Sequence, residues 1–144
     1  MTSTPASARM CIAACAMVAL LGGCASSLGS GPSRIALSGS HEVPPVTTDA
    51  SGEALFRVER NGSIQGKVTT QGLAATAAHI HEGAAGSNGP PIVPLARTAE
   101  NEWSVPPGTR LSDAQLESYR ESGLYVNVHS SAYPGGEIRG QLVP

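Results

Sequence analysis

The chain has 144 residues, of which 40% are hydrophobic, 3% aromatic and 14% charged, and its formal net charge is -2 at pH 7. This length excludes a multidomain enzyme, and the weak charge excludes a basic surface that would hold nucleic acid. Glycine occupies 17 positions and proline 11. Because both residues favour turns, we expect a single domain with short strands and many turns.

An apolar segment at residues 10–21 leads into the sequence Leu21-Gly22-Gly23-Cys24. The segment is too short to span a bilayer, but it has the length of the hydrophobic part of a secretory signal. An aliphatic residue, two small residues and a cysteine resemble the lipobox of bacterial lipoproteins. This resemblance implies cleavage before Cys24 and acylation of that cysteine. The alternatives are an ordinary secretory signal, cleaved at a nearby small residue, and an uncleaved anchor.

Cleavage before Cys24 divides the chain into a signal peptide at residues 1–23, a flexible spacer at 24–33 and a domain at 34–144. It also removes the other two cysteines, so the mature domain contains no internal disulfide. Acyl chains on the terminal residue hold a protein to a membrane. We therefore expect a lipid-anchored, extracytoplasmic protein of the bacterial cell envelope, on the periplasmic face or the outer membrane. Its expected partners are the membrane lipid and another envelope protein, with no nucleic acid.

Several segments of the domain have the composition and alternation of strands. Residues 34–40 predict an edge strand, because the proline pair that follows at Pro44 and Pro45 excludes a central position in a sheet. The Asn61-Gly62 pair between residues 53–59 and 63–70 predicts a hairpin. Further strands are expected at residues 77–82, 102–105, 124–129 and 137–143, and a broken edge segment is expected at residues 91–96.

One segment, residues 112–122, has the pattern of a helix. Ser112 and Gln115 have the spacing of a capping box, and Gly123 is placed to end the helix. The buried stripe is expected to contain Leu111, Leu116 and Tyr119. Seven or eight short strands with one short helix predict an all-β fold, an immunoglobulin-like or Greek-key β-sandwich.

All four histidines lie in the expected domain. His79 and His81 are two positions apart on one strand, so both side chains leave the same face. Pairing of that strand with residues 124–129 would bring His129 beside them and complete a site of three nitrogen ligands. Neutral imidazoles suit copper and zinc. In the alternative reading these histidines are hydrogen-bonded groups that brace strand ends, and His41 is a solvated loop residue rather than a fourth ligand.

Other chemistries have weaker support in the sequence. There is no Gly-x-Ser-x-Gly motif for a serine nucleophile, and the carboxylates of Glu100 and Glu102 lie beside an expected turn. The glycine-rich residues 83–89 follow a strand but contain no lysine, which indicates a flexible loop rather than a phosphate cradle. Arg139 is expected to pair with a carboxylate or a backbone carbonyl. We therefore expect no catalytic residues.

The order of five sequence blocks resembles the CHRD domain, a module first described in chordin and found in bacterial secreted proteins. The blocks are LSGSHEVPPV at residues 37–46, GEA at 52–54, AHIHEG at 78–83, GLYVNVH at 123–129 and GEIRGQL at 136–142. They cover essentially the whole expected domain. The resemblance implies an immunoglobulin-like β-sandwich and implies little about activity.

The segments around the histidines are also similar to the copper-ligand strands and the active-site arginine region of Cu,Zn superoxide dismutase, another Greek-key barrel. This resemblance implies that His79, His81 and His129 are copper ligands and that Arg139 guides an anion. The chain departs from that family in three respects: it has no counterpart of the bridging histidine, no set of zinc ligands and no disulfide.

Three hypotheses follow. In the first, the protein is a non-catalytic lipoprotein whose domain binds a partner or a metal ion, copper before zinc, with Glu82 or Glu137 orienting an imidazole. In the second, it is a copper-dependent redox enzyme similar to superoxide dismutase, in which Arg139 steers an anion. In the third, it is a purely structural or protein-interaction module.

Overall fold

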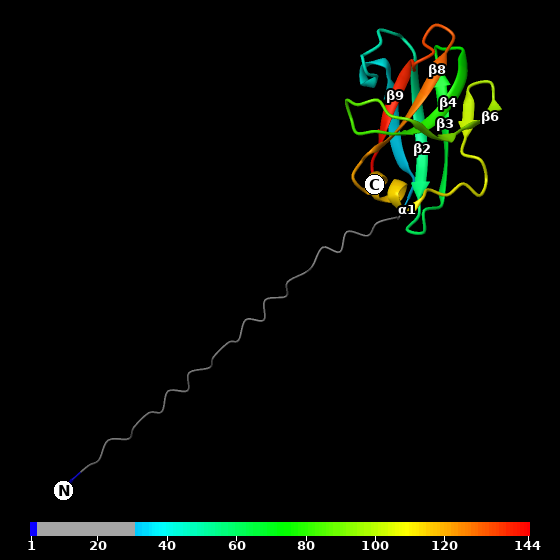
Figure 1. Cartoon of the computed structure of the whole chain (residues 1–144). Helices are drawn as coiled ribbons and strands as arrows, with labels where there is room; N and C mark the ends of the chain where they lie inside the picture. The colour runs from blue at the N-terminus through cyan, green and yellow to red at the C-terminus, as the bar shows by residue number, and fades with distance from the viewer. Residues whose placement is uncertain (3–30) are drawn as a thin grey trace.

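The computed structural model describes residues 1–2 and 31–144 of the chain (Figure 1). Most of the expected signal peptide, the lipobox with Cys24 and the spacer up to residue 30 lie outside the described residues. Within the described ranges, no helix has both the length and the apolar character needed to cross a membrane.

Nine strands and two short helices make up the domain. The strands are β1 (Ser33–Ser38), β2 (Ser51–Val58), β3 (Ile64–Gln71), β4 (Ala75–Glu82), β5 (Pro91–Pro94), β6 (Ala96–Ala99), β7 (Glu102–Ser104), β8 (Leu124–Ser130) and β9 (Ile138–Leu142). The helices are the 3-10 helix η1 (Gly39–His41) and the α-helix α1 (Asp113–Arg120).

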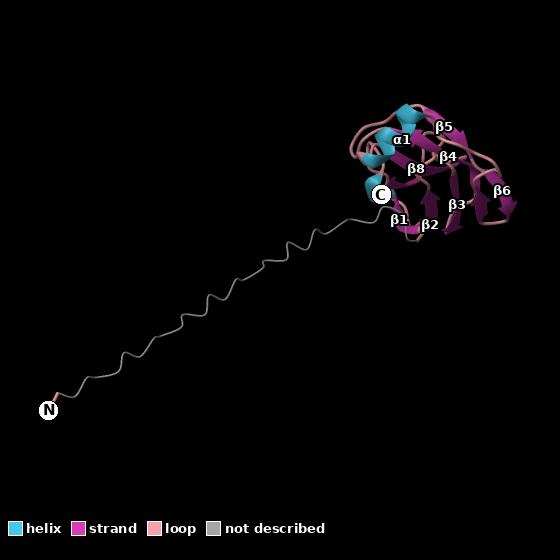
Figure 2. Ribbon diagram, turned by 90° about the horizontal axis from the view of Figure 1, so that it is seen from below, coloured by secondary structure: helices cyan, strands magenta, loops and turns pink. Residues whose placement is uncertain are grey.

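The strands hydrogen-bond in the order β5-β4-β8-β9-β1-β2-β3-β7-β6, and all neighbours are antiparallel. Strands β2 and β3 pair over eight positions, whereas a single pair, Ser38 with Arg139, joins β1 to β9. The sheet therefore divides at this seam into two layers. We call β5-β4-β8-β9 the histidine layer and β1-β2-β3-β7-β6 the second layer; Figure 2 shows them on opposite sides of the domain.

Alternating apolar residues of both layers point inward and form one core. Its most deeply buried members include Ala54, Phe56, Ile64, Val68, Ala78, Ile80, Leu124, Val126, Val128, Ile138 and Leu142. The residues of the core come from positions 35 to 142, so this segment of the chain contains the complete hydrophobic core of the domain. The predicted all-β sandwich with one short helix is confirmed.

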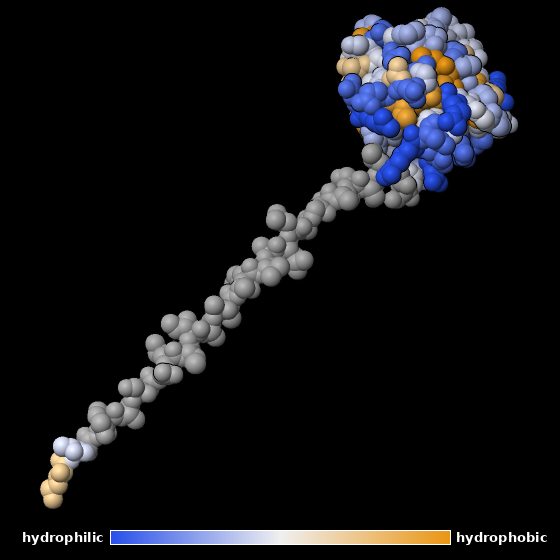
Figure 3. All heavy atoms as spheres, turned by 60° about the horizontal axis from the view of Figure 1, so that its bottom comes forward, coloured by the Kyte–Doolittle hydropathy of each residue, from blue (hydrophilic) through white to orange (hydrophobic). Residues whose placement is uncertain are grey.

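Little apolar surface is left for other contacts. Apart from Met1, Val143 is the one large apolar side chain that is exposed among the described residues. On the face seen in Figure 3, polar side chains surround a small apolar area.

Local sequence signals account for the turns. The predicted hairpin between β2 and β3 is present, and Gly62 of its Asn-Gly pair has a φ of 85°. Helix α1 begins as predicted, because Ser112 accepts from the backbone of Gln115 and the Gln115 side chain accepts from the backbone of Ser112. Gly123 ends the helix differently from the prediction. The left-handed residue is Ser122, with a φ of 57°, and Gly123 donates its N–H to Ser118 at 2.7 Å.

One strand prediction is corrected. The expected edge strand at residues 34–40 is β1, which ends at Ser38, is followed by η1 and lies between β9 and β2 in the pairing order. The expected broken edge segment at residues 91–96 is present as two strands at opposite ends of the sheet, β5 in the histidine layer and β6 in the second layer. The chain changes layer at Leu95, whose side chain is buried in the core.

Candidate metal centre

The three predicted histidines lie together on the outer face of the histidine layer. In the register of β4 and β8, His79 is opposite Asn127, His81 is opposite Tyr125, and His129 is opposite Ala77. Because Ile80, Val126 and Val128 are fully buried in the core, the residues that alternate with them must face outward. Burial of the apolar positions thus sets the orientation of the histidines.

The histidine side chains are close enough to share one ion. One nitrogen atom from each ring can be chosen so that the three atoms lie within 4.8 Å of one another. Nδ1 of His79 lies 3.0 Å from Nε2 of His129. The centroid of the His81 ring lies 5.7 Å from that of the His79 ring and 6.0 Å from that of the His129 ring. His41 is not in this group; its Nδ1 lies 3.2 Å from the carbonyl oxygen of Arg139.

Backbone carbonyl groups orient two of the rings. His81 donates from Nδ1 to the oxygen of Gly89 at 2.9 Å, and His129 donates from Nδ1 to the oxygen of Pro134 at 3.0 Å. A carbonyl oxygen can only accept, so in both neutral rings Nδ1 carries the hydrogen and Nε2 carries a lone pair. Metal-ligating histidines in proteins commonly have this arrangement.

The Nε2 atom of His81 is the most informative atom of the site. His81 is 8% exposed, and its Nε2 is buried without a hydrogen-bond partner among the described residues. A buried polar atom without a partner is rare, because it loses its hydrogen bond to water and gains nothing in return. A metal ion at this position would accept the lone pair. The donor set therefore fits a soft or borderline ion that prefers imidazole ligands.

The protonation of the rings favours the same role. Burial lowers the pKa of His79, and the neighbouring His129 and His81 lower it further by repulsion between imidazolium charges. Burial also lowers the pKa of His129, with a smaller opposing effect from the Pro134 carbonyl. Both rings are therefore neutral near pH 7, and protons compete weakly for their lone pairs.

A stack of side chains continues from His81 across the layer. The His81 ring stacks on Tyr125 with a centroid distance of 4.9 Å and an interplanar angle of 16°. The guanidinium carbon of Arg139 lies 3.4 Å from the centroid of the Tyr125 ring. Arg139 also donates to the carbonyl oxygens of Ser87 and Ala84 at 3.0 and 3.1 Å. Arg139 thus anchors the glycine-rich loop (residues 83–90), from which Gly89 reaches the imidazole.

All the residues of this site lie in a segment that matches one known protein family. The family model of the CHRD domain matches residues 34–142. The chain belongs to the CHRD family. No curated protein and no solved structure gives a significant match to it. The similarity of the histidine segments to Cu,Zn superoxide dismutase therefore stays a prediction from the residues.

The two carboxylates expected to orient the imidazoles have other surroundings in the CHRD domain. Among the hydrogen bonds of the described residues, neither Glu82 nor Glu137 bonds to a histidine. Glu137 is buried and accepts from the hydroxyl groups of Thr48 and Ser130. It holds the loop before β2 against the connection between β8 and β9. The orienting groups are instead the carbonyls of Gly89 and Pro134, which no residue type in the sequence could indicate.

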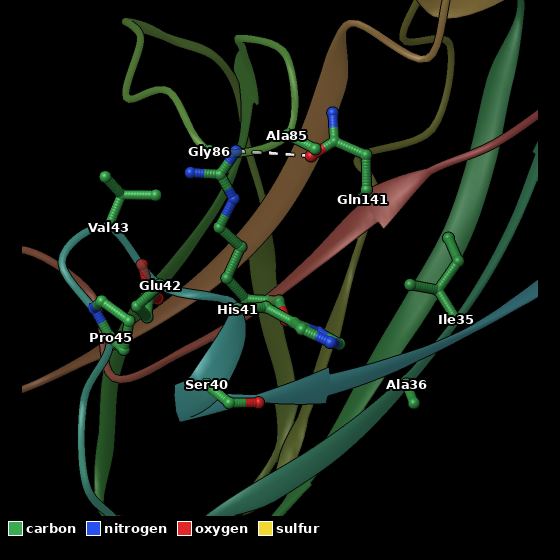
Figure 4. A pocket seen from close by; sticks show the side chains of 11 residues that line it. Ile35, Ala36, Ser40, His41, Glu42, Val43, Pro45, Ala85, Gly86 and Gln141 are labelled. Carbon is green, nitrogen blue, oxygen red and sulfur yellow. Dashed lines mark hydrogen bonds between the residues drawn. The ribbon is translucent and has the colours of Figure 1, made fainter.

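A half-open pocket lies beside Arg139 on the same side of the CHRD domain (Figure 4). Its volume is about 720 Å³, with Glu42 and Val43 on one side and Gln141 on the other. The Glu42 side chain is 5% exposed, and burial raises its pKa to about 7 although the charge of Arg139 and the amide of Asn127 act in the opposite direction. Glu42 Oε1 and Asn127 Oδ1 are both buried without a hydrogen-bond partner among the described residues.

Proposed function

We propose that this protein is a lipid-anchored envelope protein whose CHRD domain binds one copper ion without catalysing a reaction. The ligands are one ring nitrogen of His79 and the Nε2 atoms of His81 and His129. The observation that carries this proposal is the buried, unpartnered Nε2 of His81, which lies beside two further imidazole nitrogens. Sites built from nitrogen ligands bind copper more tightly than zinc, so we place copper first.

The position of Arg139 favours binding over catalysis. An arginine that guides an anion to a metal must offer N–H groups to the solvent. Arg139 is 1% exposed, donates to the carbonyls of Ser87 and Ala84, and lies against the face of Tyr125. Copper bound here would supply a positive charge that the three lone pairs stabilise. The protein groups hold that ion and orient its ligands, as a carrier or store requires.

Titration of residues 31–144 with copper and with zinc tests the copper site. This segment contains the complete core and all four histidines, and it contains neither cysteine nor methionine, so sulfur ligands cannot produce a signal. We expect one copper ion to bind with a submicromolar Kd, measured by calorimetry. His81→Ala should abolish binding, because it removes the buried Nε2 ligand.

His41→Ala is the matched control. It removes the one histidine outside the cluster and should leave the copper affinity unchanged. If the unaltered domain binds no copper, or if His81→Ala binds as well as His41→Ala, the histidines are structural. The third hypothesis, an interaction module, would then be favoured.

The membrane anchor is supported by Leu21-Gly22-Gly23-Cys24 at the end of the apolar segment. Cys24→Ser removes the sulfur that would carry lipid. We expect the unaltered full chain to incorporate labelled fatty acid and to sediment with membranes in a bacterial host, and the variant to do neither. Equal membrane association of both forms would point to an uncleaved apolar anchor.

A further inference from the structure

A permanent positive charge lies one ring away from the histidine cluster. Tyr125 belongs to β8, which lies between β4 with His81 and β9 with Arg139. The imidazole and the guanidinium therefore approach Tyr125 from opposite sides, at 4.9 and 3.4 Å from its centroid. The separation of the guanidinium carbon from the centre of the His81 ring cannot exceed the sum of these two distances.

Within residues 31–144, no carboxylate contributes to the electrostatics of His79 or His129. The three proposed ligand residues are imidazoles, which bind a metal ion in their neutral form, and the groups that orient His81 and His129 are neutral carbonyls. Glu82 follows His81 directly, so the alternation of the strand directs its side chain to the other face. The pKa values of His79 and His129 are lowered by burial and by neighbouring imidazoles, and no carboxylate contributes to either shift.

Among the described residues, the carboxyl group that acts on Arg139 is that of Glu42. Glu42 comes from the loop after η1, faces Arg139 and Asn127, and is buried. A protonated Glu42 contributes no negative charge. An ionised Glu42 partly cancels the positive charge of the Arg139 guanidinium. The difference between the two protonation states of Glu42 can therefore be used to test the effect of that charge.

We infer that Arg139 makes the histidine site selective for monovalent copper. This inference rests on the copper site of the proposed function and specifies its cargo. The energy of the ion in the field of Arg139 is proportional to the charge of the ion, so the guanidinium opposes Cu(II) twice as strongly as Cu(I). Neutral ligands leave the full charge of the ion uncompensated. At a separation of roughly 10 Å and an effective dielectric constant of 20 to 40, the ratio of the two affinities changes by about tenfold.

Two substitutions of Arg139 separate its charge from its hydrogen bonds. Arg139→Lys and Arg139→Gln both lose the forked contacts to Ser87 and Ala84, but lysine keeps the positive charge and glutamine does not. Cu(I) affinity is measured by competition with bicinchoninate under anaerobic reducing conditions, and Cu(II) affinity by competition with glycine. We expect the ratio of Cu(I) to Cu(II) affinity to be about tenfold lower in the glutamine variant than in the lysine variant.

Equal ratios in the two variants would overturn the inference, even if both bind copper. A wild-type domain that binds neither ion would overturn the proposed function instead, so the two failures are distinguishable. Circular dichroism establishes first that each variant is folded.

Glu42→Gln provides the test if an Arg139 variant does not fold. The amide has nearly the shape of the carboxyl group and removes the group that offsets Arg139. At pH 8 the wild-type carboxyl is ionised, so the variant should have a higher ratio of Cu(I) to Cu(II) affinity than wild type. An unchanged or lower ratio would contradict a role for the charge of Arg139.

Discussion

The two layers of the sandwich have similar inner faces and different outer faces. Both bury alternating aliphatic residues in the common core. The second layer carries exposed ion pairs on its outer face, such as Arg34 with Glu53. The histidine layer carries Tyr125, Asn127 and Arg139 there, each no more than 2% exposed.

This contrast identifies the face that needs a functional explanation. When the outer face of a layer is exposed to solvent, polar side chains on that face are explained by solubility alone. When loops cover the outer face, both faces of the layer can be apolar. The histidine layer is covered and is nevertheless polar. Burying polar groups costs free energy unless each finds a partner, so the unpartnered Nε2 of His81 and Oδ1 of Asn127 lower the stability of the domain. Ligand binding is a reason to retain them.

The largest effect on stability is expected at the centre of the covered face. Tyr125→Ala removes a ring packed between His81 and Arg139 and should lower the free energy of unfolding by about 3 kcal/mol. Tyr125→Phe keeps the ring but leaves the Gly89 N–H without its acceptor, and should cost about 1 kcal/mol. Urea unfolding followed by Trp103 fluorescence measures both. If Tyr125→Ala costs no more than an exposed substitution on the second layer, the two outer faces do not differ as described.

A smaller, pH-dependent effect is expected at Glu42. Its pKa in the folded domain is about 7, above the value of 4.5 for the free side chain, so the folded state holds the proton more tightly than the unfolded state. The associated stability is present below pH 4.5 and is lost as the pH rises through 7. We expect a loss of about 2 kcal/mol over this range, allowing for partial solvation of the carboxyl group.

Comparison with Glu42→Gln isolates this contribution from the titration of the histidines. The variant lacks the ionisable group, so its stability relative to wild type should rise between pH 4.5 and pH 8. The quantity measured is the difference in urea unfolding free energy at several pH values. A difference that does not vary with pH would show that Glu42 titrates normally.

The smallest effect is expected on the second layer. Arg34 and Glu53 form an ion pair whose side chains are 69% and 42% exposed. Arg34→Ala should change the free energy of unfolding by about 0.5 kcal/mol or less, and addition of salt should remove the difference. A cost comparable with that of Tyr125→Phe would remove the distinction between the solvated and the covered face.

Local patterns in the sequence predicted much of the fold. Alternation put His79 and His81 on one face, and the Asn61-Gly62 pair predicted the hairpin. These signals work because they depend only on the geometry of one strand or one turn. The change of layer at Leu95 could not be predicted in this way, because the strands on either side of it have only four residues each, too few for a clear alternation.

The three-histidine cluster was predictable from the sequence, and its surroundings were not. The His-x-His spacing put two imidazoles on one face, and the pairing of β4 with β8 brings His129 beside them. The carbonyls of Gly89 and Pro134, the burial of Arg139 and the approach of Glu42 depend on loops that fold over the sheet from distant parts of the chain. Glu82 and Glu137 were reasonable candidates by residue type, but a backbone oxygen has no signature in the sequence.

The course of β1 has a consequence for how the site faces its surroundings. The chain enters the domain at Ser33, and five positions later Ser38 pairs with Arg139, which is in register with Asn127 and His79. At the rise of an antiparallel strand, this row lies about 16 Å beyond the point of entry. If lipid at Cys24 holds the entry end near a bilayer, this row lies on the part of the domain farther from the bilayer, where a soluble donor or acceptor of the proposed copper ion could reach the histidines.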